Sequence, residues 1–162
     1  MKFYDDGDAL TEPRGFFCSG VHCDVKGKRD GKLDLGIIYS KKPCSVAGVF
    51  TTNDVTAAPV KYCESLTRDE KTICHAIVAN SGNANACTGP QGLSDALEMA
   101  ALTGQALGMK SSDVLVGSTG RIGVPLPMPN IRKGITAVAR QLQPTQAGAA
   151  QAAEAILTSD TQ

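Results

Sequence analysis

The chain has 162 residues, which is enough for one compact hydrophobic core, and we expect residues 1–162 to form a single unit. Its 16 basic and 16 acidic residues cancel, so no overall field attracts nucleic acid or an anionic membrane. The start lacks the basic and then apolar layout of a secretory signal, and no apolar stretch approaches the roughly 20 residues of a membrane span. We therefore expect a cytoplasmic protein.

The first 35 residues are rich in glycine and charge, and the stretch V-K-G-K-R-D-G-K-L-D-L is typical of a solvated loop that holds a turn. Short apolar runs with β-branched residues follow, and they predict strands that are buried on at least one face. The runs are G-I-I-Y (36–39), S-V-A-G-V-F-T-T (45–52), C-H-A-I-V-A-N (74–80) and V-L-V-G-S (114–118).

Three later segments place apolar residues at helical spacing. The first begins near Ser94 and ends at Gly108, the second follows Asn130, and the third runs from about Thr145 to Leu157. Their inward stripes are predicted to be Leu97, Ala100, Ala101 and Leu107; then Ile131, Ile135, Val138 and Leu142; then Ala149, Ala152, Ala153 and Ile156. Strands first and helices interleaved later predict a mixed α/β sheet with helices packed on it.

Six scattered cysteines form no C-x-x-C pair, so we expect them to be reduced and mostly buried. A zinc site at Cys18, His22 and Cys23 is disfavoured, because their spacing matches no common zinc pattern and no second ligand cluster follows. The other histidine, His75, lies in an apolar run and is expected to be a satisfied core residue.

Small polar residues follow the predicted strand at 74–80 in the stretch A-N-S-G-N-A-N-A-C-T-G (79–89). Asn80, Asn83 and Asn85 each bring an amide acceptor and donor. Two interpretations stay open: the amides satisfy the backbone of their own loop, or they form a neutral polar wall around a substrate site.

The stretch V-L-V-G-S-T-G-R-I-G (114–123) ends another predicted strand. Ser118 directly follows Gly117, which excludes the G-x-S-x-G nucleophile elbow, and the stretch also lacks the second glycine of a dinucleotide fingerprint and the lysine of a P-loop. A turn through S-T-G could place the Thr119 hydroxyl and the Gly120 N–H side by side as an oxyanion hole, where one donor contributes roughly 3 to 4 kcal/mol. The alternative is a plain glycine turn.

Four segments together resemble the ornithine acetyltransferase family, the bacterial glutamate N-acetyltransferases of arginine biosynthesis. They occur in the family's order and span most of the chain, which makes the likeness far more specific than one short motif. The segments are C-S-V-A-G-V-F-T-T-N with A-A-P-V (44–60), V-A-N-S-G-N-A-N-A-C-T-G (78–89), G-S-T-G-x-I-G-V-P-L-P-M (117–128) and A-I-L-T-S-D-T (155–161).

This resemblance implies a layered α/β sandwich of the DmpA/ArgJ-like type, made as one precursor that cuts itself into an α and a β chain. The new N-terminal threonine of the β chain would take the acetyl group from N2-acetylornithine and pass it to glutamate, with no metal or organic cofactor. The sequence ends at Gln162, before the family's cleavage site, so it resembles most of an α chain. Its partner would be the β chain, in an α2β2 heterotetramer.

The same resemblance implies roles for individual residues. Thr119 and Gly120 match the family's oxyanion hole, and Thr158 matches a position that contacts substrate. Arg121 stands where the family usually has an aliphatic residue; it either faces solvent or alters the substrate pocket. Ser159, where a second threonine is common, keeps a hydroxyl.

No Ser-His-Asp arrangement is visible, but an N-terminal threonine whose own α-amino group takes the proton needs no histidine. That amine titrates near pH 8. Two alternatives stay open: a self-processing aminopeptidase of related architecture, and a non-catalytic binding subunit. The resemblance also leaves open whether acetyl-CoA serves as a second donor.

Overall fold

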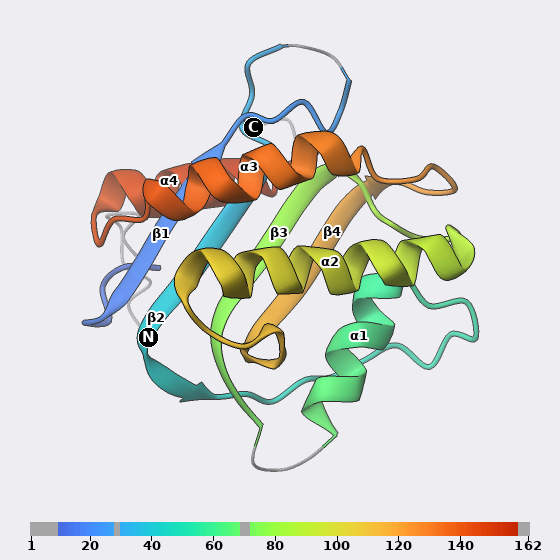
Figure 1. The fold of residues 1–162 in the computed structure, drawn as a ribbon, viewed down its shortest axis with the longest axis horizontal. Coiled ribbons are helices and arrows are strands. Elements are labelled where there is room, and N and C mark those ends of the chain that lie inside the picture. Colours follow the sequence, from blue (N-terminus) through green and yellow to red (C-terminus); the bar gives the residue numbers. More distant parts are fainter. Residues whose placement is uncertain (1–9, 28–29, 69–71, 159–162) are drawn as a thin grey trace, which may run out of the picture.

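The structure, a computed structural model, describes residues 10–27, 30–68 and 72–158 (Figure 1). Its strands β1 (Phe16–Val21), β2 (Leu35–Ser45), β3 (Ile73–Asn83) and β4 (Val114–Arg121) form one sheet in the order β1-β2-β3-β4. The β1–β2 and β2–β3 pairs are antiparallel, and β3–β4 is parallel. A parallel pair needs a crossover, which here contains α2 (Gly89–Leu107) and the short 3-10 helix η1 (Ser111–Asp113).

One face of the sheet carries α2 and α3 (Met128–Arg140), which lie across the strands in Figure 1, while α1 (Ala58–Thr67) packs near β4. Their inward side chains and those of the strands form the main hydrophobic core. Its fully buried members include Leu35, Ile37, Val78, Met99, Val114, Ile131, Ile135 and Val138. The core residues of β2, β3 and β4 alternate along each strand, as a half-buried sheet requires.

The last helix, α4 (Gln146–Ala155), lies on the opposite face. A Cβ on Gly134 of α3 would meet the Leu35 side chain, whereas a Cβ on Gly36 would meet Ala155 of α4 at 3.2 Å. Consecutive strand residues face opposite sides, so α3 and α4 sandwich the sheet at β2. Mixed strands between helices on both faces confirm the predicted α/β class.

The face that carries α4 is only partly covered. Gly36 pairs with Ala79 and Ile38 pairs with Ile77, so Ile77 lies on the α4 side of the sheet, and it is 40% exposed. A hollow of about 290 Å³ opens there. Its apolar lining includes Phe16, Ile38, Ile77 and Leu115.

Two strand predictions need correction. Residues 46–52 form no strand, and Val49 is fully exposed, because beyond the Val46 N–H bond to Thr72 the run has no neighbouring strand among the described residues. β-propensity expresses itself only where a strand can pair and pack. Conversely, β1 forms at residues for which no strand was predicted, and α1 was not predicted at all.

The three predicted helices are confirmed, with earlier starts for the first two. α2 begins at Gly89 rather than near Ser94, and α3 begins at Met128, so Pro129 lies inside its first turn. Thr145 caps α4 by accepting a 3.2 Å bond from the Gly148 N–H, and Gly108 ends α2 with a φ of +72°.

Some predicted inward residues are wrong. Leu97 is 48% exposed, and Ala101, Ala153 and Ile156 are also exposed. The buried stripe of α2 is instead Asp95, Ala96, Met99, Ala100, Thr103 and Gly104. This stripe is narrow and made of small residues, because the helix backbone approaches its neighbours closely; a Cβ on Gly104 would meet the Met109 carbonyl at 2.9 Å.

All six cysteines are unpaired; Cys18 and Cys74 are buried and Cys87 is exposed. Within the described ranges, none of the helices has the length and apolar character that crossing a membrane requires.

Candidate active site

Thr119 and Gly120 are both exposed and lie in the last residues of β4. The expected turn through S-T-G is wrong, because Ser118, Thr119 and Gly120 stay paired in parallel register with Asn80, Ser81 and Gly82. The chain bends only after Arg121. Both residues therefore stand on a rigid strand at the carboxyl end of the sheet, where ligands of open α/β sheets commonly bind.

Glycine at position 120 is required by the neighbouring strand. Its φ is +130°, and a Cβ there would lie 2.6 Å from the Asn83 nitrogen and 2.8 Å from the Gly82 Cα. Real Cβ atoms do not approach that closely, so only glycine lets the two strand ends come together. Because Gly120 has no side chain and is exposed, its backbone is open to solvent.

The outer edge of β4 is covered by α1 at its start and uncovered at its end. The Tyr62 hydroxyl donates to the Val114 carbonyl at 3.1 Å, and the Cys63 sulfur lies 3.3 Å from the Val116 carbonyl and 3.4 Å from the Val116 N–H. Beyond Val116, no residue of α1 has a described hydrogen bond to the strand. Thr119 and Gly120 occupy this uncovered end.

Asn80 and Asn85 bond to backbone close to them in the sequence, as the first interpretation expects, whereas Asn83 bonds to the segment after β4. Asn80, Asn83 and Asn85 are each at most 1% exposed, so they do not form the wall of an open site. Asn83 donates to the carbonyls of Val124 (2.9 Å) and Pro125 (3.1 Å).

The other two asparagines are bonded locally. Asn80 donates to the Asn83 carbonyl at 2.9 Å, and Asn85 donates to the Gly92 carbonyl at 2.8 Å. The side-chain oxygen of Asn80 also accepts from the Ser118 hydroxyl at 2.7 Å. These amides hold the ends of β3 and β4 in place from below the site.

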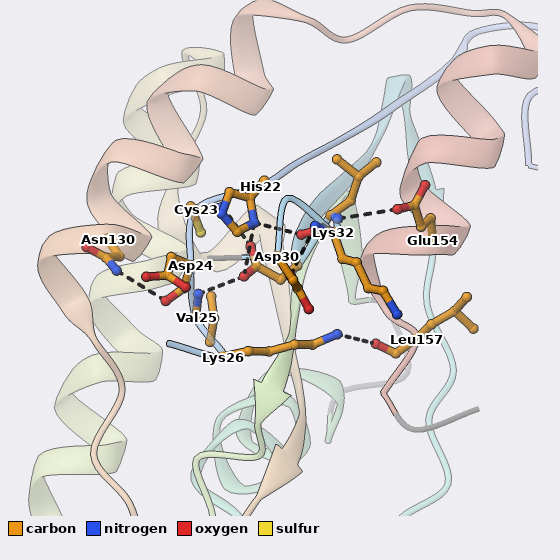
Figure 2. Close-up of polar contacts among 12 residues, drawn as sticks. His22, Cys23, Asp24, Val25, Lys26, Asp30, Lys32, Asn130, Glu154 and Leu157 are labelled. Atoms are coloured by element: carbon orange, nitrogen blue, oxygen red, sulfur yellow. Dashed lines mark hydrogen bonds and ion pairs between the residues drawn. The ribbon is translucent and has the colours of Figure 1, made fainter. Parts of the chain in front are cut away.

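Thr158 lies just beyond α4 and is exposed. The preceding carbonyl, that of Leu157, accepts a 3.1 Å hydrogen bond from the Lys26 ammonium, as Figure 2 shows. The stem of the same lysine covers Gly82, whose missing Cβ would collide with the Lys26 Cγ. Since Gly82 pairs with Gly120, one lysine side chain connects the Thr158 segment with the strand ends that carry Thr119 and Gly120.

Arg121 is exposed and its guanidinium donates a 3.2 Å hydrogen bond to the Lys26 carbonyl. It thus contacts the β1–β2 connection as well as solvent. Ser159, the second departure from the family pattern, lies outside the described residues.

Asp34 organises the β1–β2 connection from inside. This carboxylate is 1% exposed and accepts 2.7 Å hydrogen bonds from the N–H groups of Cys23 and Val25. Asn130 of α3 donates to the Asp24 carbonyl at 3.2 Å from the other side (Figure 2). The residues before Lys26 are therefore fixed on two sides.

The histidines and cysteines supply no poised nucleophile or base here. His75 is half-buried and lies 3.1 Å from the Ser40 carbonyl, and His22 lies 2.8 Å from the Lys32 carbonyl. Burial raises the pKa of the Cys18 thiol to about 11, and burial followed by the Asp34 charge raises that of Cys23. A thiol so shifted is protonated at neutral pH and is a weak nucleophile.

Cys18, His22 and Cys23 do not converge: Cys18 is fully buried on β1, whereas the His22 ring is exposed. Across residues 10–27, 30–68 and 72–158, no three His, Cys, Asp or Glu side chains are grouped as ligands of a metal ion would be.

Sequence reasoning missed Lys26 and Asp34. Lys26 was assigned to a solvated loop because acidic residues surround it, and Asp34 has no sequence feature that distinguishes a buried carboxylate from an exposed one. The available signal was the glycine of S-G-N (81–83), since a glycine between polar residues at a strand end often marks a close approach by another segment.

The matches with known proteins cover almost the whole chain. The ArgJ family model matches residues 17–162. The arginine biosynthesis bifunctional protein ArgJ of Symbiobacterium thermophilum is 51% identical over 152 residues, which are 94% of this chain and 37% of that protein. Its counterpart in Gloeobacter violaceus is 47% identical over 160 residues, which are 99% of this chain and 38% of that protein.

Two solved structures have the same fold. The ornithine acetyltransferase of Mycobacterium tuberculosis, crystallised with ornithine, superposes with a TM-score of 0.90 at 36% identity, covering 96% of this chain and 81% of that one. The arginine biosynthesis bifunctional protein of Bacillus halodurans gives a TM-score of 0.85 at 42% identity, covering 94% and 76%. The chain thus spans little more than a third of its curated relatives, but most of each crystallised chain.

Proposed function

Since the chain belongs to the ArgJ family, we propose that it is most of the α chain of a glutamate N-acetyltransferase, an acyltransferase of arginine biosynthesis that acts in the cytoplasm. The complete enzyme would transfer the acetyl group of N2-acetylornithine to glutamate. The chain spans 37% of the first of these relatives, and we propose that the rest of the precursor forms the separate β chain.

The observation that carries the proposal is the bare strand end at Thr119 and Gly120. The backbone groups of Val114 and Val116 point to the outer edge of β4, toward Tyr62 and Cys63. Alternate residues of a strand direct their backbone groups to the same edge, so we infer that the Gly120 N–H points outward too, past the end of α1. With the adjacent Thr119 hydroxyl, it offers two donors to one developing oxyanion.

The chemistry proceeds in two balanced steps. The hydroxyl of the β-chain threonine attacks the acetyl carbonyl, its proton passes to the threonine's own α-amino group, and ornithine leaves as the amine after receiving that proton. The glutamate amine then attacks the threonine ester, releasing N-acetylglutamate and restoring the hydroxyl. Each step passes through a tetrahedral oxyanion, which Thr119 and Gly120 stabilise. No cofactor is needed for this chemistry.

The uncovered half of the sheet supports a second chain as partner. Ile77 is exposed beside the 290 Å³ hollow on the side of the sheet that α4 leaves open. The segment 46–57 and the bend after β4 are also apolar and exposed, with Val49 at 100%, Val55 at 69% and Ile122 at 65%. An exposed apolar side chain beside an apolar hollow is typical of an interaction surface, and the rest of the precursor would bury these groups in an α2β2 assembly.

The test uses the complete, processed enzyme. Thr119→Ala should lower the turnover of N2-acetylornithine with glutamate at least tenfold while the α and β chains still assemble, because one oxyanion donor is lost. Thr136→Ala, at an exposed position of α3, is the matched control. Unchanged turnover in Thr119→Ala would remove the oxyanion assignment.

Kinetics and mass spectrometry test the rest of the proposal. We expect ping-pong kinetics, a trapped acetyl group on the β chain, and a co-purifying chain that begins with threonine. Acetyl-CoA is assayed beside N2-acetylornithine, because the relatives from Symbiobacterium and Gloeobacter are named bifunctional. A homogeneous short chain without transferase activity would instead favour a binding subunit, and peptide hydrolysis would favour an aminopeptidase.

A further inference from the structure

Lys26 touches three segments that are far apart in the sequence. Its ammonium donates to the Leu157 carbonyl at 3.1 Å, beyond the end of α4. Its stem lies over Gly82 at the end of β3, in space that any side chain at position 82 would occupy. Its own carbonyl accepts from Arg121 at the end of β4. Figure 2 shows the lysine extended between its loop and Leu157.

Hydrogen bonds hold the backbone that leads to Lys26. The buried Asp34 carboxylate accepts from the N–H groups of Cys23 and Val25, and Asn130 holds the Asp24 carbonyl. Lys26 is half-buried, so part of its rotamer freedom is already lost in the folded protein. A contact made by an ordered side chain transmits position better than one made by a free surface lysine.

The segment that receives this contact lies just beyond the last turn of α4. After α4 ends at Ala155, the Leu157 N–H donates to the Glu154 carbonyl at 3.0 Å, and the Leu157 side chain is 43% exposed. A cation near the last carbonyls of a helix is also favoured by the helix dipole. The Lys26 bond therefore ties Leu157, and with it the neighbouring Thr158, to the β1–β2 connection.

We propose that Lys26 is a positioning residue, which fixes the Thr158 segment against the strand ends that carry Thr119 and Gly120. This inference rests on the proposed function, because it takes Thr158 to contact substrate. Lys26 itself need not touch the substrate. Without its ammonium, the Thr158 segment loses this tie, so more of its ordering is left to substrate binding, and that cost appears in KM rather than in the chemical step.

The first test replaces the ammonium but keeps the stem. In the complete processed enzyme, Lys26→Met should raise the KM for N2-acetylornithine at least fivefold and leave kcat within about twofold of the wild-type value. Lys26→Arg should restore most of the loss, because a guanidinium can still donate to the Leu157 carbonyl. Lys133→Met, at an exposed position of α3, is the control and should have no effect on either constant.

The second test asks whether Lys26 acts through Thr158. If it does, the double variant Lys26→Met with Thr158→Ala should have nearly the KM of Thr158→Ala alone, since the restraint has nothing left to position. Independent effects that multiply in the double variant would overturn the proposal. So would an unchanged KM in Lys26→Met.

A measurement without substrate separates this inference from the proposed function. Amide hydrogen exchange in peptides that contain Leu157 and Thr158 should be several-fold faster in Lys26→Met than in wild type or Lys133→Met. Unchanged exchange would overturn the restraint even if the enzyme is an acetyltransferase. If Lys26→Met exchanges faster than wild type but the wild-type enzyme transfers no acetyl group, the restraint is kept and the proposed function is removed.

Discussion

The Ser118 hydroxyl donates a 2.7 Å hydrogen bond to the side-chain oxygen of Asn80, its partner in the parallel register of β3 and β4. Asn80 is fully buried, and its amide nitrogen is already bonded to the Asn83 carbonyl. The bond therefore anchors the residue directly before Thr119 to the interior of the sheet. A polar contact to a buried residue thus supports the exposed end of β4.

Ser118→Ala should lower the free energy of unfolding by about 1 to 3 kcal/mol, because it leaves a buried amide oxygen without its donor. Ser81→Ala is the matched comparison. The Ser81 hydroxyl is fully buried but has no hydrogen-bond partner among the described residues, so its removal should be nearly neutral. Urea unfolding of the two variants measures the difference, and equal losses of stability would contradict the assigned role of the Asn80 contact.

Gly120→Ala should destabilise the protein by more than about 1 kcal/mol and reduce acetyl transfer, because the new Cβ collides with the backbone of Gly82 and Asn83. Gly123→Ala separates this collision from the effect of a positive φ. Gly123 has a φ of +74° with nothing within 4 Å of its Cβ position, so the only cost of alanine there is the strain of a positive φ. Thermal unfolding should rank Gly120→Ala clearly below Gly123→Ala, and the same melting temperature for both would exclude the collision.

Tyr62 should make the protein less stable at alkaline pH. Burial raises its pKa to about 12, whereas a tyrosine in the unfolded chain ionises near pH 10. Between these values the folded state keeps a proton that the unfolded state releases, so the free energy of unfolding falls as pH rises. Tyr62→Phe should weaken this dependence between pH 10 and 12.

The same substitution has a separate cost at neutral pH. The Tyr62 hydroxyl donates to the Ser111 carbonyl at 2.7 Å, so its removal should cost about 1 kcal/mol there. Urea unfolding at pH 7.5, 10 and 11 measures both effects. An alkaline slope that is identical in wild type and Tyr62→Phe would show that another group titrates.

Periodicity predicted the helices α2, α3 and α4 because each buries a stripe that repeats every three or four residues. It placed Leu97 inside, however, because hydrophobicity alone does not show which side of a helix meets the sheet. The helix α1 escaped notice although Pro59 stands in its first turn and Tyr62 and Leu66 are spaced four apart.

The strands were predicted less well, because pairing depends on residues that are far away in the sequence. Residues 46–52 have strong β-propensity but no neighbouring strand in the described chain, whereas β1 forms in a glycine-rich region because β2 lies beside it. The S-T-G segment was expected to turn for a similar reason. Its glycine serves a close approach to Gly82, which only the folded sheet reveals.

The candidate site was likewise predicted only in part. Thr119, Gly120 and Thr158 were available from the resemblance, and their roles stay predictions; in the structure, Lys26 contacts both the Leu157 carbonyl and Gly82, the partner of Gly120. The buried asparagines were recognised as unusual, but their partners, such as the Val124 carbonyl, come from distant turns. Lys26 could not be identified, because its role depends on three contacts that no local pattern encodes.

Asp34→Asn should loosen the connection that carries Lys26. The carboxylate accepts from two backbone N–H groups with its two oxygens, whereas an asparagine offers one oxygen and must turn an NH2 group toward a donor. Because the site is 1% exposed, water cannot replace the lost acceptor, and we expect a loss of about 1 to 3 kcal/mol in the free energy of unfolding. Hydrogen exchange should be faster at the amides of Cys23 and Val25.

Asp54→Asn is the control, since Asp54 is exposed and the charge change is the same. If the two variants lose equal stability, overall charge rather than the two N–H bonds explains the effect. If Asp34→Asn also raises the KM for N2-acetylornithine in the processed enzyme, in proportion to the exchange at Leu157, the buried carboxylate acts on the site through Lys26. If the KM stays constant while amide exchange at Cys23 and Val25 becomes faster, the Lys26 ammonium contacts Leu157 even when its own backbone is loosened.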